Sequence, residues 1–154
     1  MSKSIMQKVK ECYLCRKDAE ILGYHGELTS EGLDKHHVIY GTANRKLSEK
    51  YGVWVYLCKK HHNEDHGLFA VHYNRHVRQQ LCEDAERAFL RMYSFEKYMD
   101  IFGKNYLELD ELNRIKTECE STSKNDNTDT AKLADHSQQQ NGLKTECPQG
   151  FWFI

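Results

Sequence analysis

Two cysteine and histidine motifs, far apart in the chain, most constrain what this sequence can fold into. Cys12 and Cys15 form a C-x-x-C motif, and Cys58 and His61 form a C-x-x-H motif. Each motif can present two ligands to one metal ion, and four such ligands complete the closed tetrahedral site of a structural zinc. The spacing therefore predicts a zinc ion that holds the two motifs side by side in the folded chain.

Further histidines surround these motifs after the four zinc ligands are assigned. His36 and His37 are adjacent, while His62 and His66 are four residues apart and would lie on one face of a helix. A solvated helix face is the usual explanation of such a spaced pair, but the adjacent pair in the same chain favours a second metal site. An imidazole base also suits neutral pH. The pattern indicates a metal-dependent hydrolase stabilised by a zinc ion.

Composition restricts the class of protein and its compartment. Residues 1–107 contain 17 Lys and Arg against 14 Asp and Glu, and residues 108–154 contain 5 against 9, so a mildly basic body precedes an acidic tail. This excess is compatible with nucleic-acid binding but is too small to establish it. The N-terminus lacks the apolar core of a signal peptide, and no apolar run approaches the roughly 18 residues of a membrane span. The six cysteines are therefore expected in a reducing cytoplasm, where such spacings bind zinc rather than form disulfides.

Hydrophobic periodicity and turn residues predict a short sheet followed by helices. The expected elements up to the second motif are a lead-in helix or disordered arm over 1–11, a tight turn at the first motif, a loop over 18–33, a strand over 34–40, a polar connection over 41–46, a short helical turn near Ser48 and a strand over 53–57. The expected elements after it are a helix from about Lys59, a helix over 74–93 with Cys82 in the core, a helix over 95–102 capped by Ser94, and a last short helix over 107–112.

Three segments of the chain resemble the HNH, or ββα-metal, endonucleases. They are Cys12-x-x-Cys15, Lys35-His36-His37-Val38 and Leu57-Cys58-x-x-His61-His62-Asn63. The likeness is nearest to small phage-encoded HNH-like proteins, including recombination-enhancement nucleases, and it covers roughly residues 11–107. It implies a core in which two strands and a helix hold a catalytic metal ion.

The resemblance implies a role for each residue that matches the family's motifs. It makes His37 the general base, and it makes His36 and His62 ligands of a catalytic divalent ion such as Mg²⁺, Mn²⁺ or Zn²⁺. Either His66 or His72 would be the last ligand of that ion. The structural zinc ligands that it implies are those already predicted from the spacing, Cys12, Cys15, Cys58 and His61.

The chain departs from the family's pattern at two places. His61 occupies a position more commonly filled by cysteine, and imidazole is an acceptable zinc ligand there. Gly52 and Val53 stand where the family has an asparagine that helps to orient the base. Either Asn44 or Asn63 substitutes for that asparagine, or its role is missing.

Polar and basic residues around the proposed metal site are candidates for DNA contact. They are Asn44, Arg45, Lys46, Lys59 and Lys60. The basic members of this set, like Arg75 and Arg78, could be ordinary solvated charges. Their position in the sequence around the metal ligands favours contact with phosphate instead.

The sequence thus predicts a small α+β protein with a zinc-stapled ββα-metal (HNH-like, His-Me finger) core, C-terminal helices and a disordered tail. The expected divisions are a nuclease domain with a helical cover over residues 1–107, a short helical extension over 108–118 and a polar tail over 119–154. The predicted function is metal-dependent cleavage or nicking of DNA, without membrane contact, and the resemblance implies the cytoplasm of a phage's bacterial host. The alternative is a non-catalytic zinc module that binds DNA or protein, such as an inhibitor or adaptor with Phe151–Ile154 as its protein contact.

Overall fold

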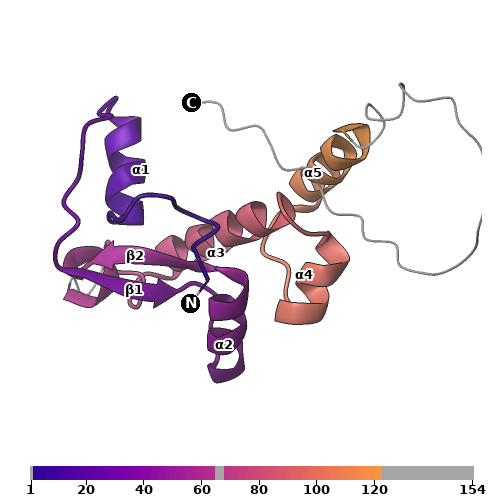
Figure 1. Cartoon of the computed structure of the whole chain (residues 1–154), viewed down its shortest axis with the longest axis horizontal. Helices are drawn as coiled ribbons and strands as arrows, with labels where there is room; N and C mark the ends of the chain where they lie inside the picture. Colours follow the sequence, from indigo (N-terminus) through magenta and orange to yellow (C-terminus); the bar gives the residue numbers. More distant parts are fainter. Residues whose placement is uncertain (1, 65–67, 123–154) are drawn as a thin grey trace, which may run out of the picture.

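The computed structural model describes residues 2–64 and 68–122 and shows a small α+β protein with a two-stranded sheet and several helices (Figure 1). The strands are β1 (Leu33–His37) and β2 (Trp54–Cys58). The helices are α1 (Tyr13–Ile21), α2 (Thr42–Tyr51), the π-helical turn η1 (Lys60–Glu64), α3 (Arg75–Leu90), α4 (Phe95–Phe102) and α5 (Leu109–Thr122). Over the described residues, none of these helices has the length and apolar character needed to span a bilayer.

The antiparallel register of the two strands decides which side chains face the core. Val55 and Leu57 of β2 are fully buried and belong to the core cluster with residues of α3. Their partners on β1 are His36 and Asp34, which therefore share the core-facing side of the sheet. His37 is the next residue along β1 and projects from the opposite side.

The segment that precedes α1 lies along β2 as an irregular arm, where a helix or a disordered arm was predicted. The Ser4 hydroxyl donates to Trp54 O at 2.6 Å, and the Tyr56 N–H donates to Gln7 Oε1, also at 2.6 Å. These bonds satisfy backbone groups of β2 that β1 does not reach. The arm therefore covers one edge of the sheet, while β1 pairs only with β2 within the part of the chain that the structure describes.

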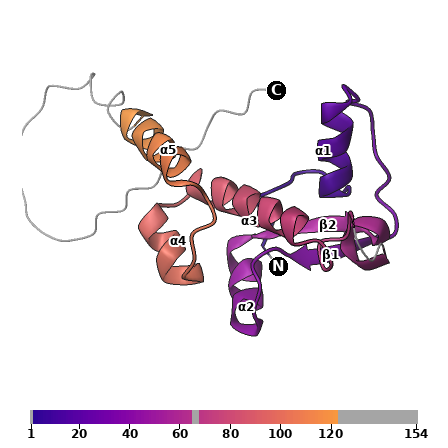
Figure 2. The same cartoon turned by 180° about the vertical axis from the view of Figure 1, so that it is seen from behind.

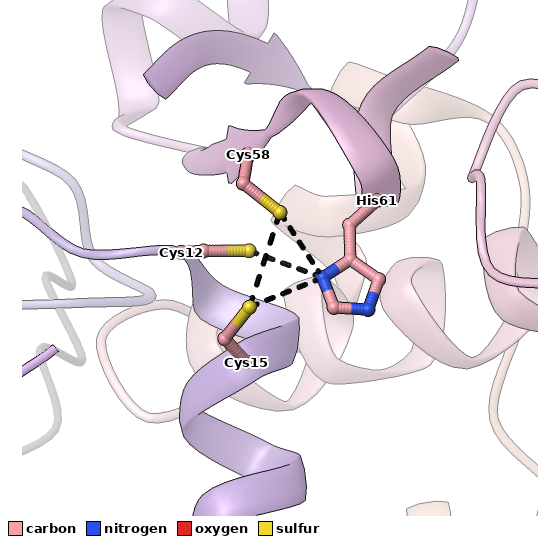
Figure 3. Close-up of side chains that lie close together, drawn as sticks. All are labelled: Cys12, Cys15, Cys58 and His61. Atoms are coloured by element: carbon pink, nitrogen blue, oxygen red, sulfur yellow. Dashed lines mark hydrogen bonds between the residues drawn. The ribbon is translucent and has the colours of Figure 1, made fainter. Parts of the chain in front are cut away.

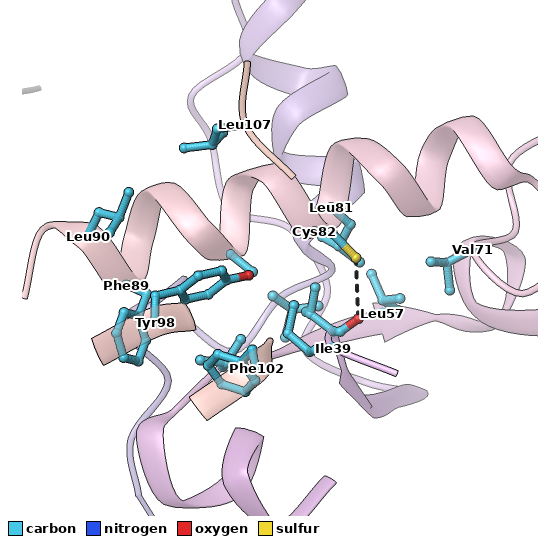
Figure 4. Packing of buried hydrophobic residues seen from close by; sticks show 14 of the residues in the cluster. Ile39, Leu57, Val71, Leu81, Cys82, Phe89, Leu90, Tyr98, Phe102 and Leu107 are labelled. Carbon is cyan, nitrogen blue, oxygen red and sulfur yellow. Dashed lines mark hydrogen bonds between the residues drawn. The ribbon is translucent and has the colours of Figure 1, made fainter. Parts of the chain in front are cut away.

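α3 extends from the sheet toward α4 and α5 (Figures 1 and 2). Most of its buried apolar residues belong to one core cluster with residues of the sheet and of these two helices. Phe89 of α3 contacts Tyr98 and Phe102 of α4, with ring centroids 5.3 and 5.8 Å away, and all three rings are buried (Figure 4). Cys82 lies nearer the sheet, where its Sγ is 3.6 Å from Val38 O. The predicted place of Cys82 in the core is confirmed.

Side-chain caps fix where α3 and α4 begin, close to the predicted positions. Asn74 accepts hydrogen bonds from two backbone N–H groups at the start of α3, and Ser94 accepts one from Lys97 N at 3.3 Å at the start of α4. α4 ends at Gly103, which has the left-handed conformation (φ 69°) common after a helix. The predicted helices over 74–93 and 95–102 are thus confirmed within a few residues.

Several boundaries differ from the sequence prediction. They are α1 continuing to Ile21, α2 starting at Thr42, and β1 ending at His37 rather than at residue 40. α2 buries only Ser48 among its residues, so hydrophobic periodicity gives almost no signal for it. Val38 and Ile39 are buried although they lie beyond β1, which explains why the run after His37 resembled a strand.

α5 continues to Thr122 and is longer than the short helix predicted over 107–112. The predicted boundary at residue 118 therefore falls inside this helix. The rest of the predicted disordered tail, with Phe151–Ile154, lies outside the described residues.

We predict that Glu86→Gln makes the folded protein less sensitive to rising pH. Glu86 is fully buried on α3, accepts from Tyr106 N at 2.7 Å, and has its pKa raised by burial. A raised folded-state pKa favours the folded protein at low pH, and this contribution is lost as pH rises through that pKa. A glutamine at this position would keep an acceptor for the same N–H without the buried charge. Urea unfolding at a series of pH values should therefore show the wild type losing stability relative to Glu86→Gln as pH rises from acid to neutral.

Glu108→Gln provides the control, because Glu108 is exposed. The difference in unfolding free energy between wild type and Glu108→Gln should not follow the same pH trend. Parallel curves for Glu86→Gln and wild type would show that Glu86 is solvated as an ordinary carboxylate.

Candidate metal centres

Cys12, Cys15, Cys58 and His61 converge where the start of α1 meets the end of the sheet (Figure 3). Cys12 is the N-cap residue of α1 and Cys15 lies in its first turn, so the helix start supplies the chain reversal that the first motif needs. Cys58 is the last residue of β2, and His61 lies in η1 directly after it. We refer to these four residues as the cysteine–histidine group.

The ligand atoms of the cysteine–histidine group have the spacing that a tetrahedral ion requires. His61 Nδ1 is 3.4, 3.3 and 3.5 Å from the Sγ atoms of Cys12, Cys15 and Cys58, and the last two Sγ atoms are 3.9 Å apart. Zn–S bonds of about 2.3 Å and Zn–N bonds of about 2.0 Å at tetrahedral angles give S···S separations of about 3.8 Å and S···N separations of about 3.5 Å. The four residues therefore lie close enough to hold a metal ion, and the donor set is compatible with structural zinc.

Burial also favours coordination through His61. Burial lowers the pKa of His61, so the imidazole is neutral and keeps a lone pair for a metal ion. Its other nitrogen, Nε2, is 3.8 Å from a carboxylate oxygen of Asp18. Burial raises the pKa of the thiols of Cys12 and Cys15, and a cation between the sulfurs would counteract this effect. The ligand atoms of the cysteine–histidine group are thus buried or half-buried with few other partners, and a bound metal ion would stabilise them.

A second cluster joins three histidines from separate parts of the chain. His36 of β1, His62 of η1 and His72, which precedes α3, offer ligand atoms that lie within 4.8 Å of one another. Nε2 of His62 is 3.1 Å from Nε2 of His72, and the His36 ring centroid is 5.3 and 5.2 Å from those of His62 and His72. We call these three residues the three-histidine group.

The buried member of the three-histidine group has a nitrogen without a hydrogen-bond partner in the described part of the chain. Nε2 of His36 is buried and makes no hydrogen bond within the described residues. Burial, followed by the nearby positive charges, lowers the pKa of His36 to about 3, so the ring is neutral at physiological pH. A neutral imidazole nitrogen that accepts no hydrogen bond keeps its lone pair available, so it is a suitable ligand for a cation. The residues present therefore fit a divalent metal ion.

Asp34 is a member of this site that the sequence analysis missed. Its Oδ2 is 2.9 Å from Nδ1 of His62 and 2.7 Å from Nζ of Lys59. The carboxylate fixes the His62 tautomer with hydrogen on Nδ1, which leaves Nε2 free to coordinate. The pKa of Asp34 is lowered by Lys59 and then by His62, so the carboxylate is ionised. The sequence could have indicated this role, because Asp34 stands two residues before His36 and therefore lies on the same face of the strand.

Three further histidines were predicted to belong to the catalytic site, and over the described residues the structure places one of them in the three-histidine group. His66 lies outside the described residues, whereas His72 lies in the three-histidine group, as one of the two predicted alternatives requires. His37 does not belong to this group as described, because adjacent strand residues point to opposite sides. Its Nε2 is 2.8 Å from Oε1 of Glu49 on α2.

Neither of the two residues proposed to replace the missing asparagine is a hydrogen-bond partner of His37. Asn44 donates to Tyr40 O, and Asn63 is exposed on η1.

The basic residues predicted to contact DNA lie on α2 and at, or directly before, the start of η1. Arg45 and Lys46 are exposed on α2. Lys59 is paired with Asp34, while Lys60 lies over the Phe69 ring, with Nζ 4.4 Å from its centroid.

Arg78 of α3 lies beside the three-histidine group. It donates to the backbone oxygen of His72 at 3.0 Å and stacks over Tyr40 at 5.0 Å. Its positive charge contributes to the lowered pKa values of both His36 and His72. Arg78 thus places a fixed positive charge next to the candidate ligands.

Comparisons of this chain with protein-family models, curated proteins and solved structures found no match. The two groups of ligands are therefore interpreted from their own geometry and chemistry.

We predict that the cysteine–histidine group binds one metal ion whose loss unfolds the protein. Cys15→Ser should lower tightly bound zinc by about one equivalent per chain and should lower the melting temperature sharply, since structural zinc contributes directly to folding. Cys82→Ala is the matched control, because Cys82 is a buried thiol outside both groups. Elemental analysis and thermal melts of the purified proteins measure both effects. Equal zinc content in the wild type and Cys15→Ser would contradict the assignment.

Proposed function

We propose that this protein is a metal-dependent DNA endonuclease of the HNH, or ββα-metal, type, which cleaves or nicks DNA in the cytoplasm of a phage's bacterial host. The observation that carries the proposal is the three-histidine group, in which a buried imidazole without a hydrogen-bond partner meets two further imidazoles in the described part of the chain. The cysteine–histidine group would hold a structural zinc beside it.

The order of the elements supports this type of nuclease. β1 and β2 form two antiparallel strands, and the helical turn η1 follows them. His36 lies on β1 and His62 on η1. This is the arrangement that the resemblance to HNH endonucleases implies. His72, the third member of the three-histidine group, is the last ligand in our proposal.

The chemistry follows from the donor set of the site. A divalent ion held by His36, His62 and His72 would neutralise charge on a phosphodiester and assist the departure of the leaving oxygen. His37 takes the proton from an attacking water, since imidazole accepts protons at neutral pH. Asp34 accepts a hydrogen bond from Nδ1 of His62, which would leave Nε2 of that ring available to the ion.

Adjacent histidines on opposite sides of β1 can still act on one phosphate. β1 pairs only with β2 among the described residues, and in this proposal the substrate approaches its other edge. A phosphate at that edge would have the three-histidine group toward one face of the sheet and His37 toward the other. Arg45, Lys46 and Arg78 would contact neighbouring phosphates of the DNA backbone.

A non-catalytic zinc module that binds DNA or protein, such as an inhibitor or adaptor derived from an HNH nuclease, is the second candidate. It is favoured by the position of His37, which lies outside the three-histidine group. The two candidates differ in one measurable property, because only the nuclease converts supercoiled DNA to nicked or linear forms.

We predict that the purified protein cleaves supercoiled or single-stranded DNA in the presence of Mg²⁺, Mn²⁺ or Zn²⁺ and not in EDTA. His37→Ala should lower the rate roughly 10²–10⁴-fold while DNA binding is retained, because it removes the base and leaves the metal ligands. His62→Ala should weaken both the rate and the binding of the divalent ion, because it removes a ligand.

His76→Ala is the control for a histidine substitution, because His76 is exposed on α3 outside the three-histidine group. It should cleave as the wild type does. A wild-type protein that binds DNA and cleaves none with any of the three ions would favour the non-catalytic module. Cleavage by His37→Ala at the wild-type rate would identify a different base.

A further inference from the structure

Glu49 makes contacts that neither metal group uses. It lies near the end of α2, and its Oε1 is 2.8 Å from Nε2 of His37 and 2.5 Å from Nζ of Lys35. Lys35 and His37 are two residues apart on β1 and therefore project from the same side of the strand. The Glu49 side chain is one-third exposed and the His37 side chain is mostly buried, at 16% exposure. One carboxylate thus links α2 to two residues of β1.

The hydrogen bond selects one form of the His37 ring. An ionised carboxylate only accepts hydrogen bonds, so His37 must carry a hydrogen on Nε2 when it binds Glu49. The neutral ring then has its lone pair on Nδ1, where it can take a proton from water. A base needs such a fixed tautomer, because it keeps the lone pair on the nitrogen that faces the water.

Lys35 keeps the carboxylate ionised and in place. Its ammonium group is the main cause of the lowered pKa of Glu49, with His37 adding to the effect. The lysine is itself held over the indole of Trp54, with Nζ 4.0 Å from the ring centroid. The carboxylate therefore has two cationic or hydrogen-bonding partners on β1, and these restrict its orientation.

The backbone around Glu49 is anchored at the junction of α2 and β2. The Ser2 hydroxyl donates to Glu49 O, and Val53 N–H donates to Ser48 O at 2.8 Å. α2 ends at Gly52 in the left-handed conformation (φ 74°), and a side chain at this position would collide with Lys3 O. Gly52 therefore allows the arm, α2 and β2 to meet closely, and this contact fixes Glu49 opposite His37.

We propose that Glu49 is the positioning residue for His37, and that it performs the orienting role that an asparagine has in the HNH endonucleases. The inference rests on the proposed function, since it assigns Glu49 to the base of that reaction. Its basis is the hydrogen bond between β1 and α2, together with the different partner of Asn44, which donates to Tyr40 O instead of to His37. A simple ion pair between Lys35 and Glu49 is the competing explanation, and such partly exposed pairs contribute little to stability.

The test compares Glu49→Gln with Lys35→Met in the full chain loaded with Mn²⁺. Both substitutions break the ion pair, but only Glu49→Gln removes the carboxylate from His37. Glu49→Gln should lower kcat roughly 10- to 100-fold with KM for DNA nearly unchanged, whereas Lys35→Met, which leaves the carboxylate beside His37, should lower kcat by a clearly smaller factor. Glu49→Asp, which keeps the charge, should recover part of the loss. Glu20→Gln, on the exposed surface of α1, is the control for removal of a carboxylate.

Two further measurements separate positioning from a structural effect. If Glu49 acts through His37, the double variant His37→Ala with Glu49→Gln should be no slower than His37→Ala alone. In the protein as purified, with no Mn²⁺ added, ¹⁵N NMR of His37 should show the Nε2–H tautomer in the wild type and a mixture of tautomers in Glu49→Gln. Additive losses in the double variant, or equal losses in Glu49→Gln and Lys35→Met, would overturn the role of Glu49. In that case the nuclease itself would stand, whereas a wild type that cleaves no DNA would remove both proposals.

Discussion

Both metal groups depend on one short turn, η1, because two adjacent histidines of this turn belong to different groups. His61 belongs to the cysteine–histidine group and His62, the next residue, belongs to the three-histidine group. Successive side chains of a helical turn project in different directions, so one short turn serves two sites. Cys15, 46 positions before His61, closes the first group from α1. An ion in the cysteine–histidine group would therefore fix η1, and through it the position of His62.

The two sides of the sheet hold different groups of side chains. Asp34 and His36 face the core side, where they meet His62, and His37 faces the other side, where it meets Glu49. Each side thus pairs a histidine with a carboxylate from a neighbouring position or helix. The carboxylates act on the nitrogen that does not perform the proposed chemistry, which fixes the tautomer of each ring. The short strand β1 positions all of these groups because its alternation is rigid.

Sequence reasoning identified the ligands better than it identified what supports them. The motif spacing predicted that Cys12, Cys15, Cys58 and His61 converge, because two-residue gaps fit one metal ion regardless of the fold around them. The support from Glu49 depends on α2, which buries one residue and shows almost no hydrophobic periodicity. Asp34 was interpreted only as the start of a strand. Carboxylates that orient histidines follow no spacing rule across elements, since tertiary packing alone brings them together.

The charge around the three-histidine group bears on the kind of ligand that the site accepts. Its three imidazoles offer nitrogen donors, and Asp34 is the carboxylate that contacts them among the described residues, through His62. Arg78 adds a fixed positive charge close by, and Lys59 neutralises much of the charge on Asp34. A divalent ion in such a site would leave a local excess of positive charge over the described residues. An anion that binds together with the metal would balance this charge, and in the proposed function a phosphodiester of the DNA backbone supplies that anion.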